Sequence, residues 1–181
     1  MLSTLMLLLG CAIHRLDLPG RSELQDFLAI DGNAAALARF EALLVAEGVA
    51  DVVPAADLWR QGTDWQTVGH PAYALPPEEM WPAVVPTLRV LRDDVRPLIG
   101  PFVVVSGFRT AEYNAAAGGA AGSRHRWFEA VDVVPRRSWE REELHGLLLG
   151  WWGERGPTLN LGLGLYSKTR FHVDTWKHRK W

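Results

Sequence analysis

Apolar residues recur every three or four positions in the first half of the chain, and this spacing predicts amphipathic helices. The pattern is clearest over residues 34–46 and 78–99. Ser22 and Asp31 stand before helical segments and are predicted to be their N-caps. Prolines inside the second segment should bend or shorten that helix. The first half of the chain is therefore expected to be mainly helical.

A long segment without a periodic pattern, residues 51–77, separates these two helices. It is rich in proline, glycine and polar residues, which predicts an extended segment that wraps around the domain. Trp59, Trp65 and Tyr73 lie in this segment, and such aromatic residues favour packing against a core. A groove for sugar or peptide is the alternative role of the same aromatic residues.

The second half of the chain contains shorter apolar runs that predict strands. Residues 102–106 and 131–134 are β-branched runs typical of buried strands. Residues 161–166 and 170–174 flank a short polar loop, which predicts a β-hairpin. A further helix is predicted over residues 139–152. Together these elements predict an α+β fold in which helices pack on a small central antiparallel sheet.

Composition places the chain among ordinary globular proteins. Its 181 residues fit one domain, and an apolar content of 48% is sufficient for a hydrophobic core. The net charge of −2 provides no electrostatic basis for binding nucleic acid, which excludes that class of function. No apolar stretch of about 20 residues is present, so no ordinary membrane-spanning helix is expected. The basic run at residues 177–180 is predicted to be a solvated tail.

Residues 1–11 resemble a bacterial lipoprotein signal, in which the peptide is cut before a cysteine that is then lipidated. The apolar run ends at Cys11, the single cysteine of the chain, so an intrachain disulfide and a cysteine-based metal site are excluded. The run is short and has no Lys or Arg before it, which a misplaced start codon would explain. This interpretation places the protein in the periplasm of a bacterial cell envelope, with a lipid anchor at Cys11. An apolar segment that packs on the domain is the alternative.

The last third of the chain contains the residue types of a zinc site. Asp132 lies in an apolar strand, where a carboxylate is costly to bury unless it is paired or bound to a metal. His172 and Asp174 share one face of another strand. With His125, two imidazoles and one carboxylate make the ligand set of an open zinc site. Arg109 follows the first strand, where it can clamp a carboxylate, stabilise an oxyanion or form a structural ion pair.

Several motifs follow one another in this part of the chain: Ser106-Gly107-Phe108-Arg109, Ser123-Arg124-His125, Ala130-Val131-Asp132, and Gly162-Leu163-Gly164-Leu165-Tyr166 followed by Phe171-His172-Val173-Asp174. As a set they resemble the zinc D-alanyl-D-alanine peptidase family, which shares its fold with the hedgehog signalling domain. The family includes carboxypeptidases and endopeptidases that cut peptidoglycan stem peptides. The resemblance implies zinc bound by His125, Asp132 and His172, and substrate contacts from Arg109, Ser123 and Tyr166. Ser123 would also brace the loop that carries His125.

The position of the general base departs from the family pattern. The family often has a Glu or His shortly before its last ligand, but the residues before His172 include neither. Asp174, the neighbour of His172 on the same face, is then the candidate base. It could instead orient a ligand imidazole without entering the reaction, and both roles stay open. A second departure is Glu129, which stands where a small residue is common.

The sequence therefore predicts a monomeric zinc peptidase that acts on peptidoglycan, of the D-Ala-D-Ala carboxypeptidase or murein endopeptidase type. Residues 12–77 would form a helical part and a wrapping loop, and residues 78–181 would form the metallopeptidase core of the same domain. Two alternatives are a non-catalytic peptidoglycan-binding module of the same fold and a structural lipoprotein whose His and Asp are hydrogen bonded. Zinc content and digestion of cell-wall material separate these three functions.

Overall fold

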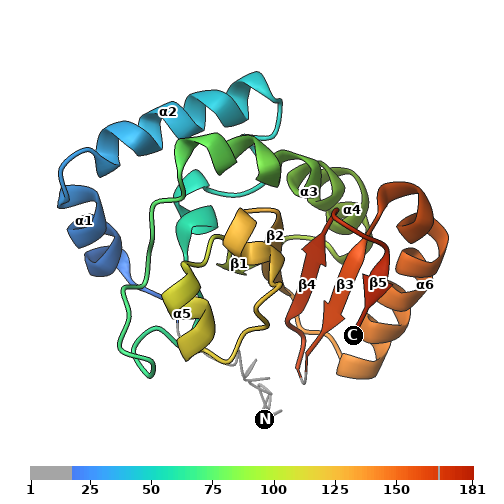
Figure 1. Ribbon diagram of the computed structural model, residues 1–181. Helices are drawn as coiled ribbons and strands as arrows, with labels where there is room; N and C mark the ends of the chain where they lie inside the picture. Colours follow the sequence, from blue (N-terminus) through green and yellow to red (C-terminus); the bar gives the residue numbers. More distant parts are fainter. Residues whose placement is uncertain (1–17, 167) are drawn as a thin grey trace, which may run out of the picture.

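The computed structural model describes residues 18–166 and 168–181, which form helices and one sheet (Figure 1). The predicted α+β class is confirmed. The predicted lipoprotein signal with Cys11 lies outside the described residues. None of the helices in this part of the chain has the length and hydrophobicity of a membrane-spanning helix.

The N-terminal part is helical, as predicted, but its helix starts differ from the prediction. Helix α1 spans Arg21–Ala29 and helix α2 spans Asn33–Ala46. Both N-caps are glycines, so the prediction of Ser22 and Asp31 as caps was wrong. The cap of α2, Gly32, has a φ of 84°, a left-handed conformation that glycine adopts without strain.

The segment after α2 packs its aromatic side chains into the core. It contains the short 3₁₀ helix η1, Ala55–Trp59. Trp59 and Tyr73 are buried, Trp65 packs partly buried against the core, and Phe40 of α2 stacks on Trp59 with ring centroids 5.5 Å apart. The packing role predicted for these aromatic residues is confirmed.

The single helix predicted over residues 78–99 is a series of short helical turns. They are η2 Glu78–Val84, α3 Val85–Val90, the π-helical turn η3 Leu91–Val95 and α4 Arg96–Ile99. Pro86 and Pro97 stand in the first turns of α3 and α4, where a missing N–H group is tolerated. The prolines thus divide the segment, while its predicted apolar face stays buried.

The sheet has five strands in the order β1-β2-β4-β3-β5. They are β1 Phe102–Ser106, β2 Ala130–Pro135, β3 Gly162–Leu165, β4 Phe171–Asp174 and β5 Arg179–Lys180. The first four pair antiparallel as predicted, whereas β5 pairs parallel with β3. The prediction that the basic run at 177–180 is a solvated tail was therefore wrong for its last residues, because their backbone extends the sheet.

The register of the sheet separates an apolar face from a polar one. Asp132 in β2 stands opposite His172 in β4, which stands opposite Gly164 in β3. Because side chains alternate along strands, this row shares one face of the sheet. The residues between them are apolar and buried against the helices: Val131, Val133, Leu163, Phe171 and Val173.

Three further helices flank the sheet. Helix α5, Ala111–Ala116, is capped by Thr110, whose hydroxyl accepts a hydrogen bond from the backbone N–H of Tyr113 at 3.1 Å. The 3₁₀ helix η4, Arg124–Trp127, leads into β2. Helix α6 spans Arg141–Leu159, so it begins later and runs further than the predicted 139–152.

Gly107 lies where the end of β1 meets the wrapping segment. A β-carbon at this position would lie 2.0 Å from the carbonyl oxygen of Leu58. The structure therefore requires a glycine here for the close approach of two backbones. We expect Gly107→Ala to lower the free energy of unfolding by about 3 kcal/mol, as measured by urea denaturation, because the obstacle is main chain and cannot rotate away.

Gly146 in α6 provides the matched control, because an added β-carbon there meets nothing within 4 Å. Gly146→Ala should raise the free energy of unfolding by about 0.5–1 kcal/mol through helix propensity. Equal stabilities of the two alanine variants would contradict the structural account of Gly107.

Candidate metal centre

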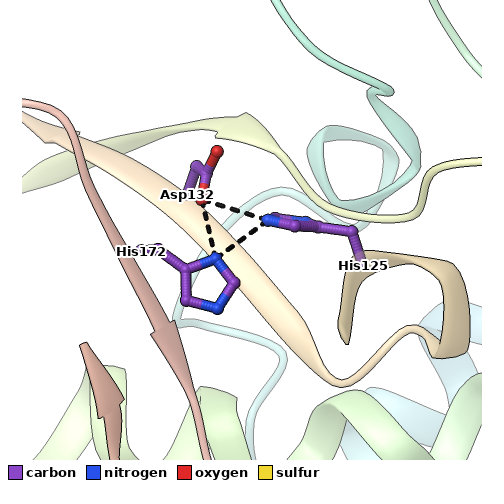
Figure 2. Close-up of side chains that lie close together, drawn as sticks. All are labelled: His125, Asp132 and His172. Atoms are coloured by element: carbon purple, nitrogen blue, oxygen red, sulfur yellow. Dashed lines mark hydrogen bonds and ion pairs between the residues drawn. The ribbon is translucent and has the colours of Figure 1, made fainter. Parts of the chain in front are cut away.

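Three buried side chains converge on the polar face of the sheet, as the sequence predicted. His125 comes from η4, Asp132 from β2 and His172 from β4 (Figure 2). Nε2 of His125, Oδ1 of Asp132 and Nδ1 of His172 lie 3.0 Å from one another in every pair. Segments distant in sequence thus bring three potential ligand atoms to one point.

The other nitrogen of each imidazole is held by an acceptor. Nδ1–H of His125 donates to the carbonyl oxygen of Gly107 at 2.7 Å, and Nε2–H of His172 donates to Oδ2 of Asp174 at 2.9 Å. These bonds place the ring protons away from the centre. The converging nitrogens then present lone pairs toward a carboxylate oxygen, an arrangement that requires a proton or a cation between them.

The donor set fits zinc. Zinc binds imidazole nitrogen at about 2.0–2.1 Å in tetrahedral sites, so neighbouring ligand atoms are about 3.3 Å apart. The observed 3.0 Å separations need an adjustment of only a few tenths of an ångström. Two histidines and one carboxylate leave a fourth position for water or substrate, as in catalytic zinc sites.

The charges of the three groups differ. Burial, followed by the positive charge of Arg109, lowers the pKa of His125 to about 4, so this ring is neutral at physiological pH. Burial opposes ionisation of Asp132, but His125 and Arg109 nevertheless hold its pKa well below the usual range. Burial also disfavours a charged His172, yet its hydrogen bonds to Asp132 and Asp174 raise its pKa above the ordinary value.

Zinc binding should therefore compete with protonation of His172. Because zinc needs a neutral imidazole, we expect the apparent zinc affinity to fall by up to about tenfold per pH unit below the raised pKa of His172, and to level off above it. Competition with a chromophoric chelator between about pH 5 and pH 8 measures this dependence. An affinity that does not change across this range would contradict the expected proton release.

Arg109 lies beside Asp132 and is held by it, by Ser106 at the end of β1 and by the wrapping segment. Its Nη2 donates to Oδ2 of Asp132 at 2.8 Å, and its Nε donates to the carbonyl oxygen of Gln61 at 3.0 Å and to Oγ of Ser106 at 2.8 Å. The structural ion pair that the sequence left open is thus present. Contact of Arg109 with substrate stays a prediction.

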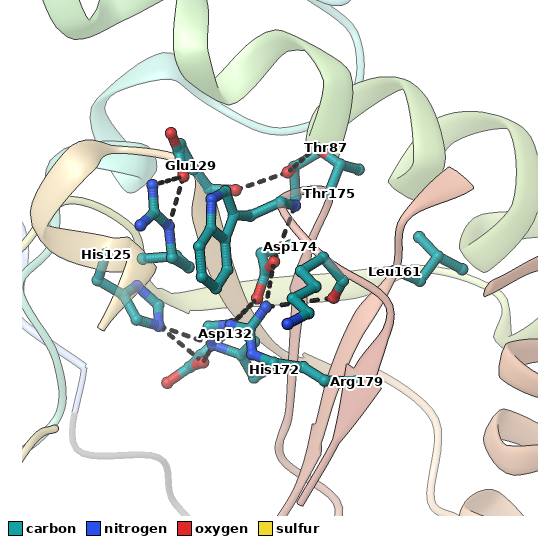
Figure 3. A network of polar contacts seen from close by, with 12 residues as sticks. Thr87, His125, Glu129, Asp132, Leu161, His172, Asp174, Thr175 and Arg179 are labelled. Atoms are coloured by element: carbon teal, nitrogen blue, oxygen red, sulfur yellow. Dashed lines mark hydrogen bonds and ion pairs between the residues drawn. The ribbon is translucent and has the colours of Figure 1, made fainter. Parts of the chain in front are cut away.

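Asp174 is placed behind His172, with both carboxylate oxygens engaged (Figure 3). Arg179 donates to Oδ2 at 2.8 Å and to Oδ1 at 3.1 Å, and the backbone N–H of Trp176 donates to Oδ1 at 3.0 Å. Asp174 contacts Nε2 of His172, the nitrogen that faces away from the centre. Of its two predicted roles, these contacts favour orientation of the imidazole over that of general base.

The two remaining predicted residues lie at different places. The backbone of Ser123 braces the turn before His125, since its N–H donates to Ala120 and its carbonyl accepts from Arg126, but its hydroxyl makes no hydrogen bond within the described residues. Tyr166 follows β3 and lines a cleft of about 460 Å³. Burial, with the negative charge of Asp132, raises the pKa of Tyr166 to about 12, so the phenol keeps its proton.

Sequence reasoning missed two residues that support the centre. Gln61 lies in the wrapping segment, and its carbonyl oxygen accepts from both Arg109 and Ser106. Arg179, in the run interpreted as a solvated tail, holds Asp174. Gln61 has no local sequence signal, because it acts through its backbone on residues 45 and 48 positions away. Arg179 is only five residues from Asp174, but it lies in a basic run whose composition is typical of a solvated tail.

Comparison with known proteins agrees with this geometry. Residues 56–148 match the family model described as peptidase M15, and this match covers more than half of the chain. It includes Arg109, His125 and Asp132, whereas His172 lies beyond its end. Among curated proteins and among solved structures, none matches the chain significantly. With its buried His-Asp-His group and this match, the chain belongs to the peptidase M15 family, whose members are zinc-dependent peptidases.

Proposed function

We propose that this M15 peptidase hydrolyses amide bonds in peptidoglycan stem peptides or in their cross-links. The observation that carries the proposal is the convergence of His125, Asp132 and His172 beside the guanidinium of Arg109. Family membership supports the peptidase activity, and the resemblance of the motifs supports the cell-wall substrate.

The residues of the chain have separate tasks in this reaction. When bound, zinc supplies a Lewis acid and lowers the pKa of a bound water toward about 7. His125 and His172 present lone pairs to it because Gly107 and Asp174 fix their protons on the other ring nitrogens. Asp132 supplies the negative charge of the ligand set, and Arg109 neutralises its second oxygen.

We propose that Tyr166 assists on the substrate side. It lies on the same face of the sheet as His172, two residues beyond Gly164 of β3, and lines a cleft between β3 and α6. Its phenol remains protonated at neutral pH, so its O–H can donate a hydrogen bond to a substrate oxygen that gains negative charge.

The contacts of Arg109 favour the endopeptidase type. A carboxypeptidase needs a cation that is free to bind the terminal carboxylate of its substrate. Arg109 already binds Asp132, and its Nε already donates to Gln61 and Ser106. We therefore propose a bond within a cross-link as the main target.

A non-catalytic peptidoglycan-binding module is the second candidate. The specific observation in its favour is that Asp174, the predicted base, faces away from the centre and is fully engaged by His172, Arg179 and Trp176. Such a module would bind peptidoglycan through the same surface without hydrolysing it.

Digestion of purified peptidoglycan and of defined muropeptides tests these functions. The zinc-loaded protein should split cross-linked dimers into monomers, as identified by mass spectrometry, and a chelator should abolish the products. Release of terminal D-alanine alone would identify a carboxypeptidase instead. Zinc-independent binding without products would support the binding module, and neither binding nor products would contradict both candidates.

This function implies a cell-envelope location. We propose that the protein works as a monomer in the periplasm, with peptidoglycan as its partner and a lipid anchor at Cys11. The support is the resemblance of residues 1–11 to a lipoprotein signal together with the proposed substrate.

A further inference from the structure

Three tryptophans with exposed side chains come from the elements that carry the metal centre. Trp127, Trp176 and Trp181 are 37, 52 and 53% exposed. Trp127 ends η4, the helix of His125, and Trp176 follows β4 two residues after Asp174. Trp181 follows β5. Exposed apolar side chains that gather at one place indicate a binding surface, and we call these three residues the tryptophan row.

The tryptophan row begins at the metal centre. Backbone hydrogen bonds to Leu163 and Leu165, at 3.1 and 3.0 Å, join Trp181 to the edge of β3. Its indole lies over Gly164, where a β-carbon would be 2.8 Å from the nearest ring atom. Gly164 stands opposite His172, and the rings of Trp181 and His172 have centroids 5.0 Å apart. The first indole of the row therefore lies on the face of the sheet that carries the metal ligands.

Two guanidinium groups link the three rings. Cζ of Arg124 lies 4.6 Å from the ring centroid of Trp127 and 4.5 Å from that of Trp176. Cζ of Arg179 lies 5.0 Å from the centroid of Trp176 and 4.9 Å from that of Trp181. A guanidinium at this distance from an indole is attracted by the π-electrons of the ring. The five side chains thus form one continuous surface from η4 to β5.

Each of these two guanidinium groups is neutralised by a carboxylate. Arg124 forms an ion pair with Glu129, which replaces the small residue common in the family. Arg179 donates to Asp174 at 2.8 and 3.1 Å (Figure 3). A guanidinium has five N–H donors, so each arginine keeps donors that its carboxylate does not use. The row therefore combines aromatic rings with hydrogen-bond donors whose charge is already balanced.

These properties fit an uncharged ligand that has both C–H groups and oxygen atoms. The negative face of an indole attracts C–H groups, and the free N–H groups can donate to hydroxyl or carbonyl oxygens. The remaining charges stand at the two ends of the row and have opposite signs. They are Arg126, whose Cζ lies 5.1 Å from the ring centroid of Trp127, and the α-carboxylate of Trp181. A sugar ring has the required combination of groups.

We propose that the tryptophan row binds sugar rings of the glycan strand to which the stem peptide is attached. The C–H faces of the sugars pack on the indoles, and Arg124 and Arg179 donate hydrogen bonds to their oxygens. The inference rests on the proposed function and extends the recognised part of the substrate from the peptide to the glycan. The row holds the substrate and takes no part in breaking the amide bond.

One cross-linked dimer of stem peptides, prepared in two forms, tests the tryptophan row. The first form carries its disaccharides, and the second lacks them and has acetylated N-termini, so that no charged amine is introduced. The zinc-loaded wild type should show a kcat/KM about tenfold higher for the disaccharide form, mainly through KM. Trp127→Ala and Trp176→Ala should each reduce this preference to less than about threefold. Trp176→Phe, which keeps an aromatic ring, should retain most of it.

Val45→Ala is the matched control, because Val45 is an exposed apolar residue of α2 and lies outside the row. This variant should keep the preference of the wild type. Equal kcat/KM values of the wild type for the two forms would overturn the proposal. It would also be overturned by an unchanged preference in both alanine variants, or by an equal loss in Val45→Ala.

If the wild type cleaves neither form, the proposed function fails, and a binding measurement decides on the tryptophan row. The probe is the tetramer of N-acetylglucosamine, titrated into the zinc-loaded protein in a calorimeter. Binding by the wild type that is at least about tenfold weaker in Trp176→Ala would support the row. Absence of binding, or equal binding by the two proteins, would overturn it.

Discussion

Asp132→Asn protein should retain less than about one tenth of an equivalent of zinc after dialysis, and its peptidase activity should fall at least about 10³-fold. Asparagine keeps the shape of the side chain but removes the only negative charge among the three converging groups. Zinc would then be held by two neutral imidazoles next to the uncompensated guanidinium of Arg109. Elemental analysis and a muropeptide assay measure the two quantities.

Asp93→Asn is the control for this prediction. Asp93 forms its ion pair with Arg92 at the surface, and its side chain is 54% exposed. We expect this variant to bind zinc and to cleave substrate like the wild type. Undiminished zinc binding by Asp132→Asn would show that the three residues do not form the metal site.

Asp174→Asn separates the two roles that the sequence left open for this residue. If Asp174 orients His172, the variant should bind zinc about 10–100-fold more weakly, and activity at saturating zinc should recover to within about tenfold of the wild type. If Asp174 is the general base, zinc affinity should stay unchanged, and activity should fall about 10²–10⁴-fold even at saturating zinc. Its contacts with His172 and Arg179 lead us to expect the first result.

Arg179→Gln provides an independent check on the same residue. Within the described residues, the Arg179 side chain forms hydrogen bonds with Asp174 but with none of the three converging side chains. If Asp174 orients the imidazole of His172, Arg179→Gln should also weaken zinc binding, but less than Asp174→Asn does. A zinc affinity of Arg179→Gln equal to that of the wild type would contradict the idea that Arg179 acts through Asp174 on His172.

Local patterns were sufficient to predict the elements that carry the metal centre. The β-branched runs became β1 and β2, and the alternation around His172 placed its side chain on the polar face. The isolated carboxylate of Asp132 in an apolar strand was the strongest single signal. These predictions succeeded because each depends on the period of a strand, which is a local property.

Contacts between distant segments could not be predicted in the same way. Alternation along the strand places His172 and Asp174 on one face. It does not predict that Nδ1 of the His172 ring contacts Asp132 while Nε2 contacts Asp174. The close approach of Leu58 to Gly107 and the pairing of β5 with β3 depend on how segments distant in sequence meet. Even the start of α2 departed from its apparent signal, because the backbone at Gly32 needs a positive φ.

The spacing of the three converging residues also makes the metal centre depend on the C-terminal hairpin. Asp132 and His172 are 40 residues apart, and their strands become neighbours only when β4 pairs with β2. A fragment that ends before the hairpin holds only two of the three side chains, so we expect it to bind zinc much more weakly than the complete sequence.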